Sequence, residues 1–502
     1  MSLSLLPLFR VITPTLSPMR RAPWLPEAAA LAVILLAQTL LFAHGLGAGA
    51  AYDEGVYLGS LDALRAGQRL GTDIFAAQPP GFYLVLRVAA ALFGNSVEGV
   101  RTGVLALGLI GCMGAYVALR TVAGPIAGLL GAAFLVVAPP IPLYGTRVLS
   151  DLPALDVLLL SLAAAALAGA GVSTRRGWSF AAGALYVAAC SVKLSVIVAA
   201  PAFALLLLRG RRRGDLAWAG AGAGVVLAGL LVSHVRAHPE LWNSVVQYHQ
   251  QLRGLASLSG GPSLLRQVVS PSAAFTWLVL GALILALVHT LRDRRWRVSP
   301  FLVLAATGVA LVAWHRPLFE HHVVAASVGL ALCAAEPIGR ELAQSSGGRR
   351  AIISGLVGLL LVGGYTQQTR RVTNELLTED PRIATDAALL AARTHPGDFV
   401  VSDQPILAYR ARRLMPGNLI DTSAARFGVG LLTERDVLRA VDSHCAQAVV
   451  AGRAFTRRPL LLAELARRYA VIDRNPLETL YFDRRLPCSA DQEVARGSPD
   501  SP

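Results

Sequence analysis

The sequence is poor in charge and in cysteine, and each shortage excludes a class of protein. Only 15% of the 502 residues are charged and 54% are hydrophobic, whereas soluble proteins carry roughly 25% charged residues. Much of the chain is therefore expected to lie in lipid. The five cysteines form no metal-binding pattern, and the sequence has neither a Gly-Lys-Ser/Thr phosphate loop nor a dinucleotide-binding fingerprint. These absences argue against a soluble protein and against a nucleotide-dependent enzyme.

Arginine supplies nearly all of the positive charge. The net charge is +15, and the single lysine, Lys193, lies in an apolar stretch, where a charge is costly and usually functional. The arginines gather in short clusters between apolar runs, as the orientation signals of membrane proteins do. No basic patch is interleaved with aromatic residues, so we predict no nucleic-acid partner.

Apolar runs of nearly spanning length recur along most of the chain. A helix of about 20 apolar residues crosses a bilayer. Eleven runs approach that length, at approximately 27–46, 100–119, 124–140, 148–170, 178–191, 194–208, 216–234, 273–290, 299–314, 321–337 and 350–366. The fifth and sixth are short, which suggests a hairpin of half-length helices with Lys193 at the bend. The pattern predicts a polytopic α-helical membrane protein with about 11 transmembrane helices.

The placement of the arginines predicts the orientation. With the N-terminus inside, the clusters after every second span also fall inside, as the positive-inside rule requires. An odd number of spans then leaves the C-terminal part outside the cell's inner (cytoplasmic) membrane. The expected parts are a cytoplasmic segment 1–26, a transmembrane domain 27–366 with a first outer loop 47–99, an extracytoplasmic domain 367–490 and a disordered tail 491–502.

The first outer loop has helical patterns of its own. From Asp53 to Gln68, apolar residues recur among polar ones, which indicates a helix lying in the membrane interface. Pro79 and Pro80 then start a second short helix, through about Leu92, because proline suits a first helical turn.

Residues 380–490 alternate between strand-like and helix-like runs. The strand-like runs are 400–402, 448–450 and 470–472, and the helix-like runs are 433–441 and 459–469. Thr433 with Asp436 fits an N-terminal cap. The alternation predicts a small α/β soluble domain. Its cysteines, Cys445 and Cys488, could pair if the domain faces an oxidising compartment.

Ionisable residues gather on the outer side of the predicted bundle. Two acids, Asp53 and Glu54, open the first outer loop, although compensation of a helix dipole alone would also place acids there. Arg147 and Asp151 are four residues apart at the start of the fourth span, so we expect them to share a helix face and to pair. The whole outer set is Asp53, Glu54, Arg101, Arg147, Asp151, Lys193, His321 and His322. Charges gathered on one face imply a polar cavity, suited to a substrate with an anionic part and a hydroxyl.

Two motifs resemble those of a known group of membrane enzymes. Asp53-Glu54, followed by Gln78-Pro79-Pro80-Gly81-Phe82-Tyr83, resembles the glycosyltransferases of the GT-C fold. The pattern is similar to that of the protein O-mannosyltransferases and the bacterial aminoarabinose transferases of lipid A, a glycosyltransferase family 39-like group. Arg101 entering the second span and Arg147 to Asp151 entering the fourth strengthen the resemblance, which covers about residues 25–340. It implies a GT-C-like fold in which the transmembrane domain is catalytic.

The resemblance also implies the reaction. Such enzymes transfer a sugar from polyprenyl phosphate to an acceptor with inversion, here at the outer face of the membrane. Asp53 would be the catalytic base, with Glu54 beside it. The phosphate would be bound by Arg101, Arg147, Lys193, His321 and His322, although the two arginines could instead position the acids. Substrate binding is assigned to Asp73, Gln78, Pro79, Tyr83, Asp151, Tyr248 and His249.

One position departs from the family pattern. Related bacterial enzymes often have a lysine before the first proline, where this chain has Gln78. Because glutamine carries no charge, Lys193 or an arginine would have to compensate. A divalent metal is compatible with the chemistry, but nothing in the spacing requires one, and the outer histidines are more simply polar residues at a helix end. The expected partners are the lipid bilayer, a polyprenyl-phosphate-linked sugar and a glycan, lipid or protein acceptor.

Three other functions fit part of the pattern. A transporter or flippase of a lipid-linked or anionic substrate would also have a charged cavity, but transporters often show internal repeats and sites at the bilayer midplane. Another lipid-linked transferase, such as a polysaccharide polymerase or ligase, differs only in the acid pair and the proline motif. A surface-binding protein that uses the α/β domain would not need the acids of the first loop.

Overall fold

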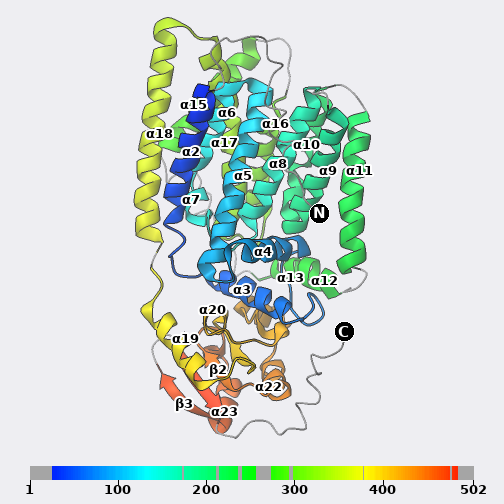
Figure 1. Ribbon diagram of the computed structural model, residues 1–502, viewed down its shortest axis with the longest axis vertical. Helices are drawn as coiled ribbons and strands as arrows, with labels where there is room; N and C mark the ends of the chain where they lie inside the picture. The colour runs from blue at the N-terminus through cyan, green and yellow to red at the C-terminus, as the bar shows by residue number, and fades with distance from the viewer. Residues whose placement is uncertain are drawn as a thin grey trace.

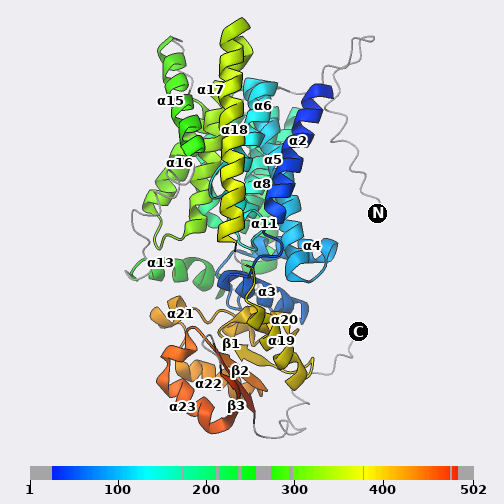
Figure 2. The same cartoon turned by 90° about the vertical axis from the view of Figure 1, so that its left-hand side faces the viewer.

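The computed structural model describes residues 25–171, 174–210, 214–235, 240–255, 273–292, 298–376, 378–474 and 478–483. They form a bundle of long helices and a smaller C-terminal unit (residues 381–483), with short helices lying crosswise between the two (Figures 1 and 2). Most of the expected N-terminal segment, the expected tail and Cys488 lie outside the described residues. Cys445 is disulfide-bonded, whereas Cys112, Cys190 and Cys333 are free.

The bundle is built from helices that coincide with the apolar runs. They are α2 (Leu25–Ala43), α5 (Val97–Ala123), α6 (Pro125–Val137), α8 (Asp151–Gly169), α9 (Arg175–Val192), α10 (Ala200–Leu208), α11 (Gly214–Leu230), α15 (Ala273–Arg292), α16 (Pro300–Trp314), α17 (Val324–Gln344) and α18 (Gly347–Glu375). Among the described helices, six are long and apolar enough to cross a membrane: α2, α5, α8, α11, α17 and α18, with α11 and α17 counted together with the helical turns that adjoin them. The others are shorter or less apolar, so the number of spans stays a prediction. The protein is a multi-pass membrane protein.

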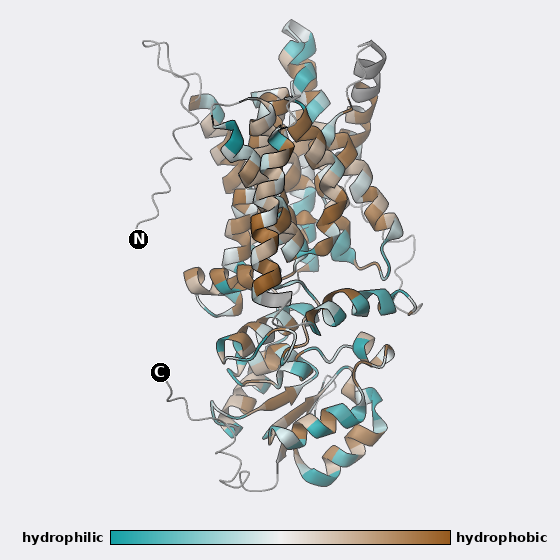
Figure 3. Ribbon diagram, turned by 90° about the vertical axis from the view of Figure 1, so that its right-hand side faces the viewer, coloured by the Kyte–Doolittle hydropathy of each residue, from teal (hydrophilic) through white to brown (hydrophobic). Residues whose placement is uncertain are grey.

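Hydrophobic residues, coloured brown, predominate along the helices of the bundle (Figure 3). On α18, Leu359 and Val362 are 70% and 67% exposed. Lipid is the solvent that accepts such a surface, because water tolerates only small apolar patches. Inside the bundle, small residues let helix backbones approach closely. A Cβ at Gly111 of α5 would lie 2.4 Å from Oδ1 of Asp156 on α8, so glycine is required at that crossing.

Lys193 lies at a break between two helices, as the sequence predicted. It is the C-cap of α9, with an extended backbone (φ −150°, ψ 121°), and a short 3-10 turn, η1 (Leu194–Ala199), leads on to α10. However, α9 has 18 residues, so the expected pair of half-length helices is wrong for its first member. The break leaves the Lys193 side chain at the outer end of the bundle.

The first outer loop forms the two expected short helices. They are α3 (Tyr52–Arg65) and α4 (Pro80–Phe93), and both lie between the bundle and the C-terminal unit (Figure 1). The α3 helix buries residues on most of its circumference, because the bundle and α4 pack on one side of it and the C-terminal unit on the other. Between α11 and α15, the short helices α12 (Glu240–Trp242) and α13 (Tyr248–Leu252) lie beside α3 and α4 at the same end of the bundle (Figure 1).

The C-terminal unit contains a four-stranded sheet with helices on both faces. The strand order is β1 (Val400–Ser402), β2 (Ala448–Ala451), β4 (Thr479–Asp483) and β3 (Tyr469–Arg474), with β1 and β2 parallel and the other pairs antiparallel. Residues on alternate sides of the strands pack against α22 (Glu434–Ser443) and α23 (Pro459–Arg468) on one face, and against α19 (Pro381–Arg393) and α20 (Pro405–Arg410) on the other. Thr433 and Asp436 form the expected capping box of α22. The sequence interpretation missed β4.

The link between bundle and C-terminal unit differs from the expected boundary. The α18 helix continues past residue 366 to Glu375, so the last membrane helix carries the chain almost to the unit. Ala48 in the first outer loop and Thr378 after α18 form an isolated antiparallel bridge. The C-terminal unit is therefore held to the first outer loop at the same place where the chain leaves the bundle.

Candidate active site

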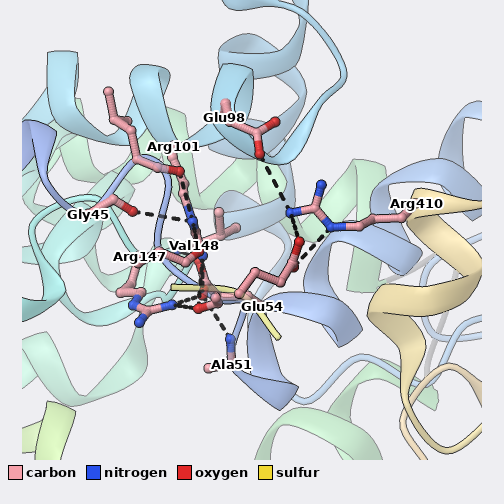
Figure 4. Close-up of polar contacts among 12 residues, drawn as sticks. Gly45, Ala51, Glu54, Glu98, Arg101, Arg147, Val148 and Arg410 are labelled. Atoms are coloured by element: carbon pink, nitrogen blue, oxygen red, sulfur yellow. Dashed lines mark hydrogen bonds and ion pairs between the residues drawn. The ribbon is translucent and has the colours of Figure 1, made fainter. Parts of the chain in front are cut away.

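Glu54 is the centre of a buried ion-pair cluster. Its side chain is fully buried and lies 2.8 Å from Nη2 of Arg101 and 2.7 Å from Nη1 of Arg147 (Figure 4). It also accepts hydrogen bonds from the backbone N–H groups of Ala51 and Val148, at 3.0 and 2.9 Å. Burial alone would raise the pKa of Glu54, but the two guanidinium groups outweigh burial and hold it below its usual value. Glu54 is therefore a permanently charged anchor between three segments of the chain.

The guanidinium groups of both arginines donate their hydrogen bonds to Glu54 and to nearby backbone carbonyl groups. Arg101 is fully buried near the start of α5, and its Nη1 also donates to the carbonyl groups of Gly45 and Leu46, at 3.2 and 2.9 Å. Arg147 donates to the Gly49 carbonyl as well as to Glu54. The expected pair of Arg147 with Asp151 is wrong, because α8 begins only at Asp151 and the helical i, i+4 geometry does not extend back to Arg147.

Asp151 pairs instead with Lys193. The Lys193 Nζ atom lies 2.7 Å from Oδ1 of Asp151, and Nε2 of His321 lies 3.8 Å from Oδ2. Ligand atoms of Asp151, His321 and His322 all lie within 4.8 Å of one another, a spacing that one divalent cation could bridge. The carboxylate of Asp151 is already paired with one positive charge, the Lys193 ammonium.

A pocket extends from the Lys193–Asp151 pair into the bundle. Its cavity volume is about 30 Å³, and beyond the two charged residues and a few small or polar ones its walls are aliphatic, including Leu155, Leu158, Val196, Leu304 and Leu311. A charged pair beside aliphatic walls suits an amphiphile whose head is anionic and whose tail is a hydrocarbon.

Asp53 lies next to Glu54 in sequence but in a different environment. Its side chain is half-buried, and no ion pair to it is present in the described part of the chain. Burial raises the pKa of Asp53 to about 6; the negative charge of Asp421 also raises it, whereas Lys193 and Arg453 lower it. Asp53 is thus a carboxylate close to both the Lys193 pocket and the C-terminal unit, and free to exchange a proton near neutral pH.

The remaining predicted residues lie around this centre. Gln78 is buried and connects two helices, since its Nε2 donates to the Tyr57 hydroxyl at 3.1 Å and its Oε1 accepts from Ser150 Oγ at 3.0 Å. Pro79 is the N-cap of α4, and Tyr83 is buried on that helix. Because Gln78 joins α3 to the residue before α8, it holds the walls of the site together without supplying charge.

Three predicted residues lie nearer the rim. Asp73 accepts a hydrogen bond from the Arg69 backbone at 2.8 Å and closes a surface turn, so it lies in a turn rather than among the charges described above. Tyr248 packs edge-on against Phe75, with ring centroids 5.2 Å apart. The Nε2 atom of His249 lies 3.0 Å from the Ala77 carbonyl oxygen; desolvation by the surrounding site lowers the pKa of His249 to about 4, so its ring is neutral.

The C-terminal unit brings residues to the site that the sequence interpretation missed. The Tyr52 hydroxyl donates to Oδ1 of Asp421 at 3.2 Å, and the Arg453 guanidinium lies 4.7 Å from the centre of the Tyr52 ring. The Arg426 guanidinium lies 3.9 Å from the centre of the Phe75 ring. No local motif marks these residues, because they are more than 300 positions away in sequence and only the fold brings them to the first outer loop.

Comparison with known proteins places this geometry in context. The sequence pattern of the dolichyl-phosphate-mannose-protein mannosyltransferase family matches residues 77–235. The fold is similar to that of ArnT from Cupriavidus metallidurans bound to undecaprenyl phosphate, with a TM-score of 0.65, 18% identity, and coverage of 92% of this chain and 98% of that one. It is also similar to the oligosaccharyltransferase of Archaeoglobus fulgidus, with a TM-score of 0.57, 13% identity, and coverage of 86% and 70%. No curated protein matches the sequence. The resemblance that Asp53-Glu54 and the proline motif suggested is confirmed: the chain has the GT-C fold of membrane glycosyltransferases.

Proposed function

We propose that this protein is an inverting glycosyltransferase that moves a sugar from a polyprenyl-phosphate donor to an acceptor at the outer face of the cytoplasmic membrane. The observation that carries the proposal is the position of Asp53. It is a half-buried carboxylate with a pKa of about 6, and its pKa is lowered by the charge of Lys193, which lines an otherwise mostly aliphatic pocket. A base and a phosphate site beside aliphatic walls are what transfer from a lipid phosphate requires.

The donor is assigned to the Lys193 pocket. The aliphatic walls suit a polyprenyl chain, and Lys193 beside them suits its phosphate. The similar ArnT structure holds undecaprenyl phosphate, which supports a donor of this class. Lys193 thereby supplies the positive charge that Gln78 cannot, and His321, 3.8 Å from Asp151, lies beside it.

The two acids of the first outer loop have different roles, proton transfer for Asp53 and positioning for Glu54. Asp53 takes the proton of the acceptor hydroxyl as that oxygen attacks the anomeric carbon, and polyprenyl phosphate leaves with its bonding electrons. Lys193 stabilises the charge that develops on the leaving phosphate, and such preorganised charge is often the largest catalytic contribution. Glu54, Arg101 and Arg147 are buried and paired with one another, so we assign them to positioning Asp53 rather than to phosphate binding.

The proposal is tested with purified protein and a panel of labelled polyprenyl-monophosphate sugars, with a membrane extract as acceptor. We expect wild-type protein to transfer sugar from one donor, and Asp53→Asn to lose about 100- to 10,000-fold of kcat, the usual contribution of a general base. Asp62→Asn is the matched control on the same helix, where Asp62 accepts a hydrogen bond from Asn95 at 2.7 Å, and it should retain activity.

Two results would contradict the proposal. Equal transfer by wild type and Asp53→Asn would remove Asp53 from the reaction. Folded wild-type protein that turns over none of the donors but moves a labelled polyprenyl phosphate across proteoliposome membranes would favour the transporter or flippase alternative.

A further inference from the structure

One of the segments by which the C-terminal unit contacts the first outer loop carries an acid. Residues 417–426 contact the first outer loop: the Phe75 N–H donates to the Gly417 carbonyl at 3.4 Å, and Arg426 covers the Phe75 ring. A Cβ at Gly417 would lie 2.5 Å from the Asp73 carbonyl oxygen, so the two backbones touch there. The segment is therefore seated on the loop that carries Asp53.

Asp421 is the acid of this segment, and the segment holds it in a fixed position. Its Oδ1 atom accepts from the Ser423 N–H at 2.9 Å and from the Tyr52 hydroxyl at 3.2 Å. Arg426 donates from Nη1 to the Asn418 carbonyl at 2.7 Å, which closes the segment around Asp421. Within the described part of the chain, no hydrogen bond is assigned to Oδ2. One oxygen is thus used to fix the carboxylate and the other is left to act.

The charge of Asp421 acts on Asp53 across the boundary between bundle and C-terminal unit. Tyr52, which is bonded to Asp421, immediately precedes Asp53, and after burial the charge of Asp421 is the largest influence that raises the pKa of Asp53. The other ionisable groups that influence Asp53 or are influenced by it are Tyr52, Tyr57, Asp151, Lys193, Tyr248 and Arg453. Holding two carboxylates close together is unfavourable, and two hydroxyl groups of one acceptor, each donating to one carboxylate, would lessen that cost.

We propose that Asp421 and Asp53 together form the acceptor-binding site: Asp53 accepts the hydrogen bond of the attacking hydroxyl, and Asp421 accepts that of a neighbouring hydroxyl of the same acceptor. Resting on the proposed transferase function, this gives the C-terminal unit a direct part in the reaction. Asp53 takes the proton, and Asp421 accepts a hydrogen bond from the acceptor and fixes its direction. Two hydrogen-bond acceptors side by side suit an uncharged polyhydroxyl group, which can donate to both. An acceptor hydroxyl next to a phosphate would be repelled by both acids.

The test is Asp421→Asn, because asparagine keeps an Oδ1 acceptor for Ser423 and Tyr52 and removes only the charge. With the donor and membrane extract found active for wild type, we expect the acceptor kcat/KM to fall about 10- to 100-fold, as for one hydrogen bond to a charged group. The donor KM and the slow hydrolysis of donor by water should stay within about twofold of wild type. Asp442→Asn, an exposed acid of the same unit, is the matched control.

A pH profile separates this role from a merely structural one. Without the negative charge of Asp421, the ionised form of Asp53 is favoured, so its pKa falls. The acid limb of kcat/KM, near pH 6 in wild type, should therefore move to lower pH in Asp421→Asn. Carbodiimide labelling of Asp53 against pH, read by peptide mass spectrometry, should show the same shift without any substrate. Tyr52→Phe, which loses one hydrogen bond to Asp421, should show a smaller effect on acceptor kcat/KM in the same direction.

The outcomes are distinguishable. An active wild type with unchanged acceptor kcat/KM and an unchanged acid limb in Asp421→Asn would overturn the acceptor role of Asp421 alone. A wild type that transfers no sugar would overturn the proposed function, and with it this inference. Equal losses of acceptor and donor kinetics, together with a lower melting temperature, would show that Asp421 serves only the fold.

Discussion

At the scale of single residues, two neighbouring acids have opposite environments. Glu54 is fully buried between Arg101 and Arg147, and its charge is fixed. Asp53 lies where the charges of Lys193 and Asp421 both act on it, and it has a pKa of about 6. Because successive residues of a helix point about 100° apart, one turn of α3 can present one acid to the buried cluster and the other to substrate.

Replacement of Glu54 tests this division. Glu54→Gln leaves Arg101 buried with no carboxylate partner, and breaking a buried ion pair in this way costs about 3–5 kcal/mol. We expect a clear fall in melting temperature in detergent. Glu375→Gln, which breaks the half-exposed Arg371–Glu375 pair, should cost at most about 1 kcal/mol. Equal melting temperatures for the two variants would show that Glu54 is not an anchor.

The site residues show what sequence can supply at this scale. Asp53, Glu54, Lys193 and Gln78 can be identified because a charge or a motif marks them in an apolar chain. The partners of these residues cannot: the pairing of Arg147 with Asp151 assumes a continuous helix, and the structure pairs Arg147 with Glu54. No sequence signal identifies Asp421 as a site residue, because acids are common in soluble domains. Only the packing of segment 417–426 brings it close to the first outer loop.

At the scale of elements, α3 is the joint between membrane and C-terminal unit. Two glycines on one of its faces let the unit approach: a Cβ at Gly55 would lie 2.7 Å from the Ile406 nitrogen, and one at Gly59 would lie 3.1 Å from Cγ2 of Ile420. Ile406 belongs to α20, whose Arg410 also pairs with Glu98 at the start of α5, at 3.5 Å (Figure 4). The contact between α3 and α20 therefore sets the distance between Asp53 and Asp421.

Adding one methyl group at this joint should loosen it. In Gly55→Ala the new Cβ meets backbone atoms that cannot turn aside, and such overpacking costs about 1–3 kcal/mol. We expect faster cleavage by protease after α18, near residues 376–380, and lower transfer activity. Gly47→Ala is the control, because no atom lies within 4 Å of the added Cβ. If both variants resist protease as the wild type does, the joint is not tightly packed.

Most of the helices can be predicted from sequence because the bundle lies in lipid. A helix in lipid must be long and apolar, so its pattern is strong, and the predicted runs fall on helices. Strand β4 is not shorter than the predicted strands β1 and β2, so length does not explain why it escapes prediction; its pairing with the distant β2 is visible only in the fold. The length of α18 beyond residue 366 escapes it because the last turns of this helix are polar, so hydropathy no longer marks them.

At the scale of the whole molecule, the arginine-rich ends of the membrane helices lie at the end of the bundle opposite the C-terminal unit. The far ends of the helices hold ion pairs of Arg120 with Glu27, Arg340 with Glu336, and others of the same kind. The site, the interfacial helices and the C-terminal unit occupy the opposite end (Figure 2). Because arginine-rich ends remain in the cytoplasm, the donor's phosphate, Asp53 and Asp421 should all lie on the outer side.

Fusion reporters test that orientation directly. Alkaline phosphatase folds only where its disulfides form, in an oxidising compartment, so a fusion after the last residue should be active. The same reporter placed between α17 and α18, at Ser345, should be inactive, because that turn lies at the arginine-rich end. A green fluorescent protein at each position should give the reverse pattern. If the C-terminal phosphatase fusion were inactive and the Ser345 fusion active, the site would face the cytoplasm, where nucleotide-activated sugars are made, and a donor linked to lipid would no longer follow from its position.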